Sequence, residues 1–385
     1  MMAQFLCDPF ENALVTEPEL PSSPMVVALE EFEVLAERSM SPMVHAYVSG
    51  GAADEITLRE NRAGWSAIRL APHVLSDVSK ICLKTEILGQ RFGMPMILAP
   101  VGLLGMCHPD GERAMVCGAN AAGAGLVLSS FSNMAIEDVT AAAEQPVWFQ
   151  LYVQKDEGLN CRLIERAQNA GCKSLCITVD TPVLGARYRE LRTHFAPPST
   201  LHLPNVELEY ISHAAAPNSI YSERLNPHLQ WKDVERICAF AKIPVLLKGV
   251  LNPEDAVRAF DTGVAGLIVS NHGGRNLDTV PSTAEALPRV IDRVKGQLPV
   301  LVDGGIRRGT DVLKALAIGA KAVLIGRPYV HALSALGAPG VARVLEILRT
   351  ELSMAMALSG RASIAEIDGS VLWPASSPHA VGGQI

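Results

Sequence analysis

The segment Ser270-Asn271-His272-Gly273-Gly274-Arg275 combines residue types that suit proton transfer and carboxylate binding. A histidine exchanges protons near neutral pH, and an arginine three residues later offers a planar pair of donors to a carboxylate. The two intervening glycines let the backbone approach a bound planar ligand closely. A lone histidine at a strand end is more often structural, but the adjacent arginine and glycines favour a site for an organic acid.

A second segment, Thr178-Val179-Asp180-Thr181-Pro182, places a carboxylate where another apolar run stops, and Arg187 follows it. A carboxylate can orient a histidine and stabilise its protonated form, and a second arginine can complete a carboxylate clamp. A helix cap is an equally good interpretation of Asp180 alone. Lys248 ends another apolar run and suits a Schiff base, a carboxylate partner or a stabiliser of charge on a cofactor ring. Spacing does not decide among these roles.

A third pair of segments is rich in glycine and arginine: Asp303-Gly304-Gly305-Ile306-Arg307 and Ile325-Gly326-Arg327. The backbone amides of such glycines, with an arginine nearby, bind phosphate well at the start of a helix. A plain turn is the alternative. Because the pattern occurs after two consecutive apolar runs, a phosphate site is favoured.

The elements that must position these residues are short apolar runs separated by helical patterns. Near-continuous apolar character indicates strands that are buried on both faces, as in parallel sheets. Eight such units in sequence predict a closed (β/α)8 barrel of the α/β class. The predicted strands are Met94 to Leu103, Gly125 to Ser130, Val147 to Val153, Ser174 to Asp180, Ile243 to Gly249, Gly266 to Asn271, Leu298 to Gly305 and Ala322 to Arg327.

An open, doubly wound sheet would give the same alternation and often carries a Gly-x-Gly-x-x-Gly turn after its first strand. Here the first strand ends Ala99-Pro100-Val101-Gly102 and lacks that turn. Polar residues instead follow nearly every run, as an active site on the top face of a barrel requires. They are Ser129, Gln150, Tyr152, Thr178, Asp180, Lys248, Ser270, His272, Asp303 and Arg327.

The flanks of the repeat suggest how one domain is organised. Residues 1–25 are polar and contain four prolines, so we expect a flexible arm, followed by a single barrel domain over residues 26–385. Apolar spacing predicts helices from Val26 to Arg38 and from Pro42 to Tyr47. The connection after the fourth strand is long and proline-rich, which predicts a lid within about residues 190–230. Membrane attachment is the alternative there, but the stretch has few bulky apolar residues and no basic cluster.

Composition excludes several function classes. The formal charge of −7 argues against nucleic acid or an acidic membrane as the main partner, and no apolar stretch is long enough to span a bilayer. The N-terminus lacks the order of a signal peptide, so we expect a soluble, cytoplasmic protein. The eight cysteines form no Cys-x-x-Cys pair and lie mostly in apolar runs, which predicts buried thiols and no metal site.

Taken together, these segments and Phe149-Gln150-Leu151-Tyr152 resemble the FMN-dependent L-2-hydroxy acid oxidases and dehydrogenases, a family that includes glycolate oxidase, lactate oxidase and mandelate dehydrogenase. The resemblance covers about Val26 to Arg361. It implies oxidation of a 2-hydroxy acid to the 2-oxo acid by bound FMN. The C-terminus is not of the Ser-Lys-Leu type that directs proteins to peroxisomes.

Carried over position by position, the resemblance implies that His272 takes the substrate proton and that Asp180 stabilises the imidazolium. Arg187 and Arg275 would hold the substrate carboxylate, with Tyr47 and Tyr152 as hydrogen-bonding partners. The implied FMN contacts are Pro100, Val101, Gly102, Ser129, Gln150, Thr178, Lys248 and Ser270 around the ring and ribityl chain, and Asp303, Gly305, Arg307, Gly326 and Arg327 toward ribityl and phosphate.

Two positions depart from the glycolate oxidase pattern and bear on the substrate. Gly102 stands where glycolate oxidases carry alanine, and Phe131 where they carry tryptophan. Both changes predict a larger pocket, for lactate-, mandelate- or longer-chain-like acids. The family further implies a homotetramer or octamer.

The electron acceptor is expected to be oxygen, since the long connection lacks a membrane segment; a dehydrogenase with a quinone or protein acceptor is the alternative. An FMN-dependent isomerase on the same barrel fits less well, because His272 and Arg275 suit a hydroxy acid. A non-catalytic phosphate-binding module would not need a proton acceptor, a carboxylate and two arginines on one face.

Overall fold

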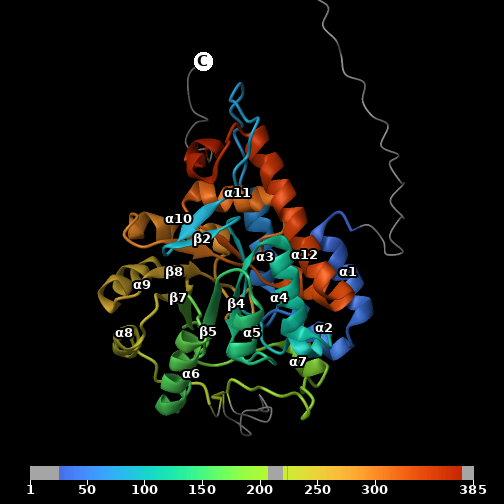
Figure 1. Ribbon diagram of the computed structural model, residues 1–385, viewed down its shortest axis with the longest axis vertical. Coiled ribbons are helices and arrows are strands. Elements are labelled where there is room, and N and C mark those ends of the chain that lie inside the picture. Colours follow the sequence, from blue (N-terminus) through green and yellow to red (C-terminus); the bar gives the residue numbers. More distant parts are fainter. Residues whose placement is uncertain (1–25, 207–219, 223, 375–385) are drawn as a thin grey trace, which may run out of the picture.

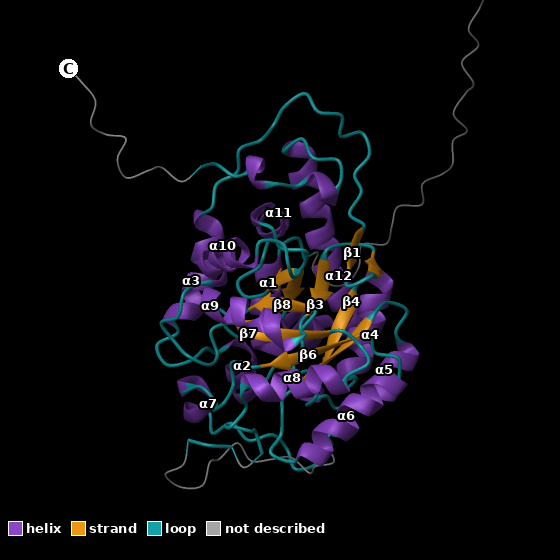
Figure 2. Cartoon of the chain, turned by 90° about the vertical axis from the view of Figure 1, so that its left-hand side faces the viewer, coloured by secondary structure: helices purple, strands orange, loops and turns teal. Residues whose placement is uncertain are grey.

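The computed structural model describes residues 26–206, 220–222 and 224–374 and contains a closed barrel of eight parallel strands, as predicted. The strands lie at the centre of the molecule with helices around them (Figure 2). Around the barrel the order is β10-β3-β4-β5-β6-β7-β8-β9. The strands are β3 (Met96–Leu98), β4 (Gly125–Ser129), β5 (Val147–Leu151), β6 (Ser174–Thr178), β7 (Val245–Val250), β8 (Gly266–Val269), β9 (Val300–Val302) and β10 (Val323–Ile325).

Several strands are shorter than predicted, mostly because apolar residues continue into the loops that follow them. Leu103, for example, has a φ of 62°, which no strand residue adopts. The loops that begin early in this way carry the candidate site. The outer helices are α4 (Gly111–Ala122), α5 (Ile136–Ala142), α6 (Glu157–Asn169), α8 (Trp231–Phe240), α9 (Pro253–Arg258), α10 (Thr283–Val294), α11 (Gly309–Ile318) and α12 (Arg327–Leu358).

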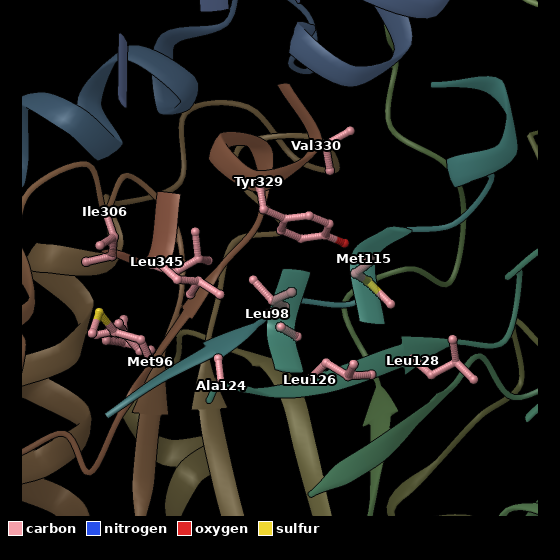
Figure 3. Close-up of a cluster of buried hydrophobic side chains, with 14 of the residues drawn as sticks. Met96, Leu98, Met115, Ala124, Leu126, Leu128, Ile306, Tyr329, Val330 and Leu345 are labelled. Carbon is pink, nitrogen blue, oxygen red and sulfur yellow. The ribbon is translucent and has the colours of Figure 1, made fainter. Parts of the chain in front are cut away.

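Two apolar layers hold the barrel together. Inside it, one side chain from each strand packs in a common cluster that includes Val127, Trp148 and Leu301. Outside it, Figure 3 shows side chains of β3 and β4 against Met115 of α4 and Tyr329 of α12. The Tyr329 hydroxyl also donates to the Ala99 carbonyl at 3.0 Å, so the ring is buried with its polar group satisfied.

The two predicted N-terminal helices are present as α1 (Leu29–Ser39) and α2 (Pro42–Ser49). The first begins three residues later than predicted, because Ala28 is extended and forms the N-cap. A third helix, α3 (Ile56–Ala67), and a hairpin, β1 (Thr85–Ile87) and β2 (Gln90–Phe92), were not predicted. The hairpin contributes Phe92, which packs edge-on against Trp148 in the barrel interior.

The cysteine prediction was partly wrong. Cys82, Cys117 and Cys161 are exposed, the last two because helical periodicity puts them on the outer faces of α4 and α6. Cys172 and Cys176 are buried free thiols, and burial raises the pKa of each to about 12. Within the described ranges, no three His, Cys, Asp or Glu side chains are grouped to hold a metal ion. None of the helices described there is long and apolar enough to cross a membrane.

The predicted arm, residues 1–25, lies outside the described residues, as do 207–219 and 223 of the predicted lid. The described part of that connection contains α7 (Tyr188–Arg192), next to α2 in Figure 1. Its later part, Ser222 to Leu225 without residue 223, borders the cavity at the strand ends. That this segment opens and closes stays a prediction.

Candidate active site

The loops after the strands enclose a cavity of about 170 Å³. The barrel's parallel strands all end on this side, which is where barrel enzymes carry their sites. Most of the predicted site residues line it: Tyr47, Pro100, Val101, Gly102, Ser129, Phe131, Tyr152, Arg187, Lys248, His272, Arg275, Asp303, Gly305, Arg307, Gly326 and Arg327. Asp180, Gln150 and Ser270 lie behind this lining and contact it through hydrogen bonds, and Thr178 lies one step further back, bonded to Gln150.

His272 is held between a carboxylate and a phenol. Its Nδ1 lies 3.1 Å from Asp180 Oδ1, and its Nε2 lies 3.1 Å from the Tyr152 hydroxyl. Burial lowers the pKa of His272, although Asp180 acts in the opposite direction. Burial would raise the pKa of Asp180, but His272 and Lys248 outweigh that effect and the pKa is lowered. The arrangement is therefore a neutral imidazole backed by an ionised carboxylate, which is suited to accepting a proton.

Two arginines face the same cavity from different segments. Arg187 Nε donates to the Arg275 carbonyl at 3.2 Å, and Arg275 donates to the carbonyls of Tyr47 and Gly50. Both guanidinium groups also contact one oxygen of Glu190, at 3.4 and 3.2 Å. The Arg275 guanidinium also lies over the Tyr47 ring, 5.0 Å from its centroid, and that ring stacks on Phe195. Two guanidinium groups fixed in one cavity are suited to binding a carboxylate.

A buried polar ladder runs across the tops of the neighbouring strands. Ser129 Oγ donates to Gln150 at 3.2 Å, and Gln150 Nε2 donates to Thr178 Oγ1 at 2.9 Å. Lys248 Nζ lies 3.0 Å from Ser270 Oγ and 3.1 Å from Asp303 Oδ2. Burial opposes the charge on Lys248, but Asp303 and Asp180 raise its pKa to about 12, so the lysine is a fixed cation.

The glycine-rich segments after β9 and β10 form the other end of the cavity. Gly304 and Gly305 have φ angles of 86° and 81°, and a side chain at 305 would collide with the Asn61 carbonyl of α3. Arg327 donates to the carbonyls of Val48, Gly50 and Gly273. Arg307 contacts Glu33 of α1 at 3.3 Å, and burial lowers its pKa to about 10. The unpredicted helix α3 and the N-terminal helices thus shape this end.

These donors and acceptors fit FMN. The second oxygen of Asp303, Oδ1, is buried without a hydrogen-bond partner among the described residues, and it lines the cavity beside Lys248. Ribityl hydroxyls would satisfy such an acceptor, the polar ladder suits the edge of a flavin ring, and two arginines with adjacent glycines suit a phosphate.

Gly102 has a different effect from the one predicted. A Cβ at this position would lie 2.9 Å from Phe131 Cβ and 3.2 Å from the Phe131 carbonyl oxygen. The space that glycine leaves is therefore filled by Phe131, and the expectation that glycine itself enlarges the pocket was wrong. Phe131 in turn stacks on Tyr152 with ring centroids 5.2 Å apart.

Sequence reasoning missed several residues of the site. Leu184, Ser222, Arg224 and Leu225 line the cavity, and the last three come from a proline-rich segment without periodicity. Glu190 had a signal, because it follows Arg187 by three residues on a helical turn, where a carboxylate can pair with an arginine.

Comparison with known proteins agrees with this geometry. Residues 36–374 match the family model described as FMN-dependent dehydrogenase. The L-lactate oxidase of Nostoc sp. strain PCC 7120 is 45% identical over 361 residues, covering 91% of this chain and 98% of that protein. Glycolate oxidase 1 of Zea mays is 45% identical over 342 residues, 88% and 93% of the two chains. A crystal structure of mandelate oxidase superposes with a TM-score of 0.83 at 36% identity, covering 91% of this chain and 98% of that one. The chain therefore belongs to the FMN-dependent dehydrogenase family, and FMN is its cofactor.

Proposed function

We propose that this protein is an oxidase that converts an L-2-hydroxy acid to the 2-oxo acid and passes the electrons to oxygen, giving hydrogen peroxide. The observation that carries the proposal is the pairing of a neutral histidine and its carboxylate with two arginines in one cavity. The matched relatives named above are oxidases of lactate, glycolate and mandelate, which supports oxygen as the acceptor.

In the proposed reaction Arg187 and Arg275 hold the substrate carboxylate, and Tyr47 adds a hydrogen bond. This orientation presents the α-carbon and its hydroxyl to Tyr152 and His272. His272 Nε2 takes a proton from the substrate, and Asp180 stabilises the imidazolium that forms. When bound, FMN supplies the two-electron acceptor.

The proposed FMN contacts follow the geometry of the cavity. Lys248 would favour negative charge on the reduced ring, because it is buried and permanently charged. Pro100, Val101, Gly102, Ser129, Gln150, Thr178 and Ser270 would surround the ring and ribityl chain, while Asp303, Gly305, Arg307, Gly326 and Arg327 would hold ribityl and phosphate. Phe131 and Gly102 would border the substrate side chain.

We also propose a cytoplasmic homo-oligomer, a tetramer or octamer. The segment between α3 and β1 projects from the top of the molecule (Figure 1) and carries Val74 and Leu75, which are 80% and 102% exposed. Adjacent exposed apolar side chains on a projecting loop suit contact with another subunit.

The test is steady-state turnover of the purified yellow protein with L-lactate, L-mandelate and glycolate. The proposal predicts one peroxide formed per oxygen consumed. Turnover with an artificial dye but not with oxygen would make the protein a dehydrogenase, and no turnover with either acceptor would contradict the proposed chemistry.

A further inference from the structure

A second cavity, of about 260 Å³, adjoins the candidate active site. It lies at the ends of β6 and β7, under the start of α8 and the returning part of the long connection. The reaction described above does not use it.

Seven of the residues that line this cavity are valine or leucine, and Asn226, Gln230 and Asp255 are among its polar ones. Leu247 and Val250 come from β7, Val234 from α8, and Val153 from the loop after β5, and all four are buried. Of its polar groups, the Thr178 hydroxyl already accepts a hydrogen bond from Gln150. A dry cavity of about 150 Å³ lined by apolar side chains is large enough for a benzene ring. This cavity therefore has room for a ring or a hexyl-sized chain.

Three residues line both cavities: Tyr152, Thr181 and Leu225. Two of them are fixed by polar contacts, since the Tyr152 hydroxyl bonds to His272 and the Thr181 hydroxyl to Asp180 and Asn276. Leu225 has no such anchor on its side chain.

The backbone on either side of Leu225 is held in place. The Lys155 amide donates to the Arg224 carbonyl at 2.7 Å, and the Asn226 amide donates to the Val153 carbonyl at 3.0 Å. The Leu225 side chain is 7% exposed and lies between the two cavities. A path between the cavities at this point therefore requires at least a change of the Leu225 rotamer.

We propose that the second cavity is a subsite for the apolar side chain of the substrate, entered past Leu225, and that medium-chain aliphatic 2-hydroxy acids are preferred to lactate. This inference rests on the proposed function, because the carboxylate and hydroxyl of the same molecule must occupy the first cavity. An alkyl chain suits the part of the subsite formed by Val234, Leu247 and Val250, because these buried side chains offer aliphatic contact.

Each methylene that enters the subsite is expected to raise kcat/KM about fourfold, which corresponds to about 0.8 kcal/mol. The experiment compares 2-hydroxybutyrate, 2-hydroxyhexanoate and 2-hydroxyoctanoate as substrates of the FMN-loaded enzyme. Butyrate, hexanoate and octanoate, which cannot be oxidised at C2, serve as competitive inhibitors in parallel. Their affinity should rise with length by a similar factor.

The variant Val234→Phe fills the far wall of the second cavity. It should lower kcat/KM for 2-hydroxyoctanoate at least tenfold and leave L-lactate within twofold. Val290→Phe is the matched control, because Val290 is equally buried on α10 but lines neither cavity. Thermal unfolding and FMN content of both variants report any general damage.

The outcomes separate the two proposals. Rising affinity with length in the wild type, lost selectively in Val234→Phe, supports the subsite. Oxidation of lactate with kcat/KM that is flat or falls with chain length overturns the subsite and leaves the proposed function intact. If no 2-hydroxy acid of any length reduces the flavin, the proposed function is contradicted and the subsite falls with it.

Discussion

Replacing Asp180 by asparagine tests the role of the buried pair beside the cavity. The change keeps the size of the side chain but removes the charge 3.1 Å from His272 Nδ1. A hydrogen bond between charged groups is worth about 1.5–3 kcal/mol, and about 1.36 kcal/mol corresponds to a factor of ten in rate. If this bond exists fully only once His272 is protonated, flavin reduction should slow about 13- to 160-fold.

The pH dependence of activity tests the role of Asp180 independently, through the direction in which the pKa of His272 moves. His272 acts as a base only when neutral, so activity rises with pH through its pKa. Because burial lowers that pKa, the rise of the pH–rate profile on its acid side, its acid limb, should lie below the ordinary value of 6.5 in the wild type. Asp180 raises the pKa of His272 against this effect, and so the limb should move to still lower pH in Asp180→Asn.

The assay is anaerobic stopped-flow reduction of the flavin at saturating substrate, which separates the chemical step from binding. Asp292→Asn on α10 is the control, because it makes the same replacement of aspartate by asparagine at another position. A reduction rate within threefold of the wild type, or an acid limb that moves upward, would refute the reasoning.

Three further predictions concern packing and charge. Gly102→Ala should destabilise the fold by about 1–3 kcal/mol, because its Cβ would press on the Cβ of Phe131. Gly102→Ala/Phe131→Gly, which removes that atom, should cost less than the sum of the single changes in a urea-denaturation cycle, and strict additivity would contradict the contact. Lys248→Met should lower the unfolding free energy of the apoprotein by about 3–5 kcal/mol, because Asp303 loses its buried partner. The double variant Lys248→Met/Asp303→Asn should regain part of this loss. A loss below about 1 kcal/mol in the single variant would show that the pair is not needed for stability. Burial raises the pKa of Glu112 to about 7, from 4.5 in an unfolded chain, so the free energy of unfolding should fall as pH rises between these values. Glu112→Gln should therefore raise the melting temperature at pH 8 but little at pH 5. An equal gain at both pH values would be inconsistent with the raised pKa.

The barrel was predictable from the sequence because its strands are buried on both faces and therefore read as unbroken apolar runs. The strand-end residues were predictable for a related reason, since a polar side chain directly after such a run must lie at the barrel mouth. The hairpin was not, because Thr85–Ile87 and Gln90–Phe92 are three residues each, with one buried side chain per strand. So short a segment carries no periodic signal.

Contacts between distant segments also escaped prediction. Glu33 of α1 meets Arg307, a pairing of residues 274 positions apart that depends on how the N-terminal helices close over the barrel. The close packing of Phe131 on Gly102 likewise depends on two loops whose approach no local pattern encodes. The residue types at the site were therefore available from the sequence, whereas the partners that fix their geometry were not.

The most direct test of the proposed chemistry is the reductive half-reaction of the wild-type protein in the absence of oxygen. L-Lactate or L-2-hydroxyoctanoate is added to the oxidised yellow protein, with the D-enantiomers as controls, and the flavin absorbance is followed before air is admitted. The account predicts bleaching by the L-acids alone, followed by rapid recovery of the yellow colour in air with formation of peroxide. Absence of bleaching with every 2-hydroxy acid would contradict the roles proposed for His272 and Arg275.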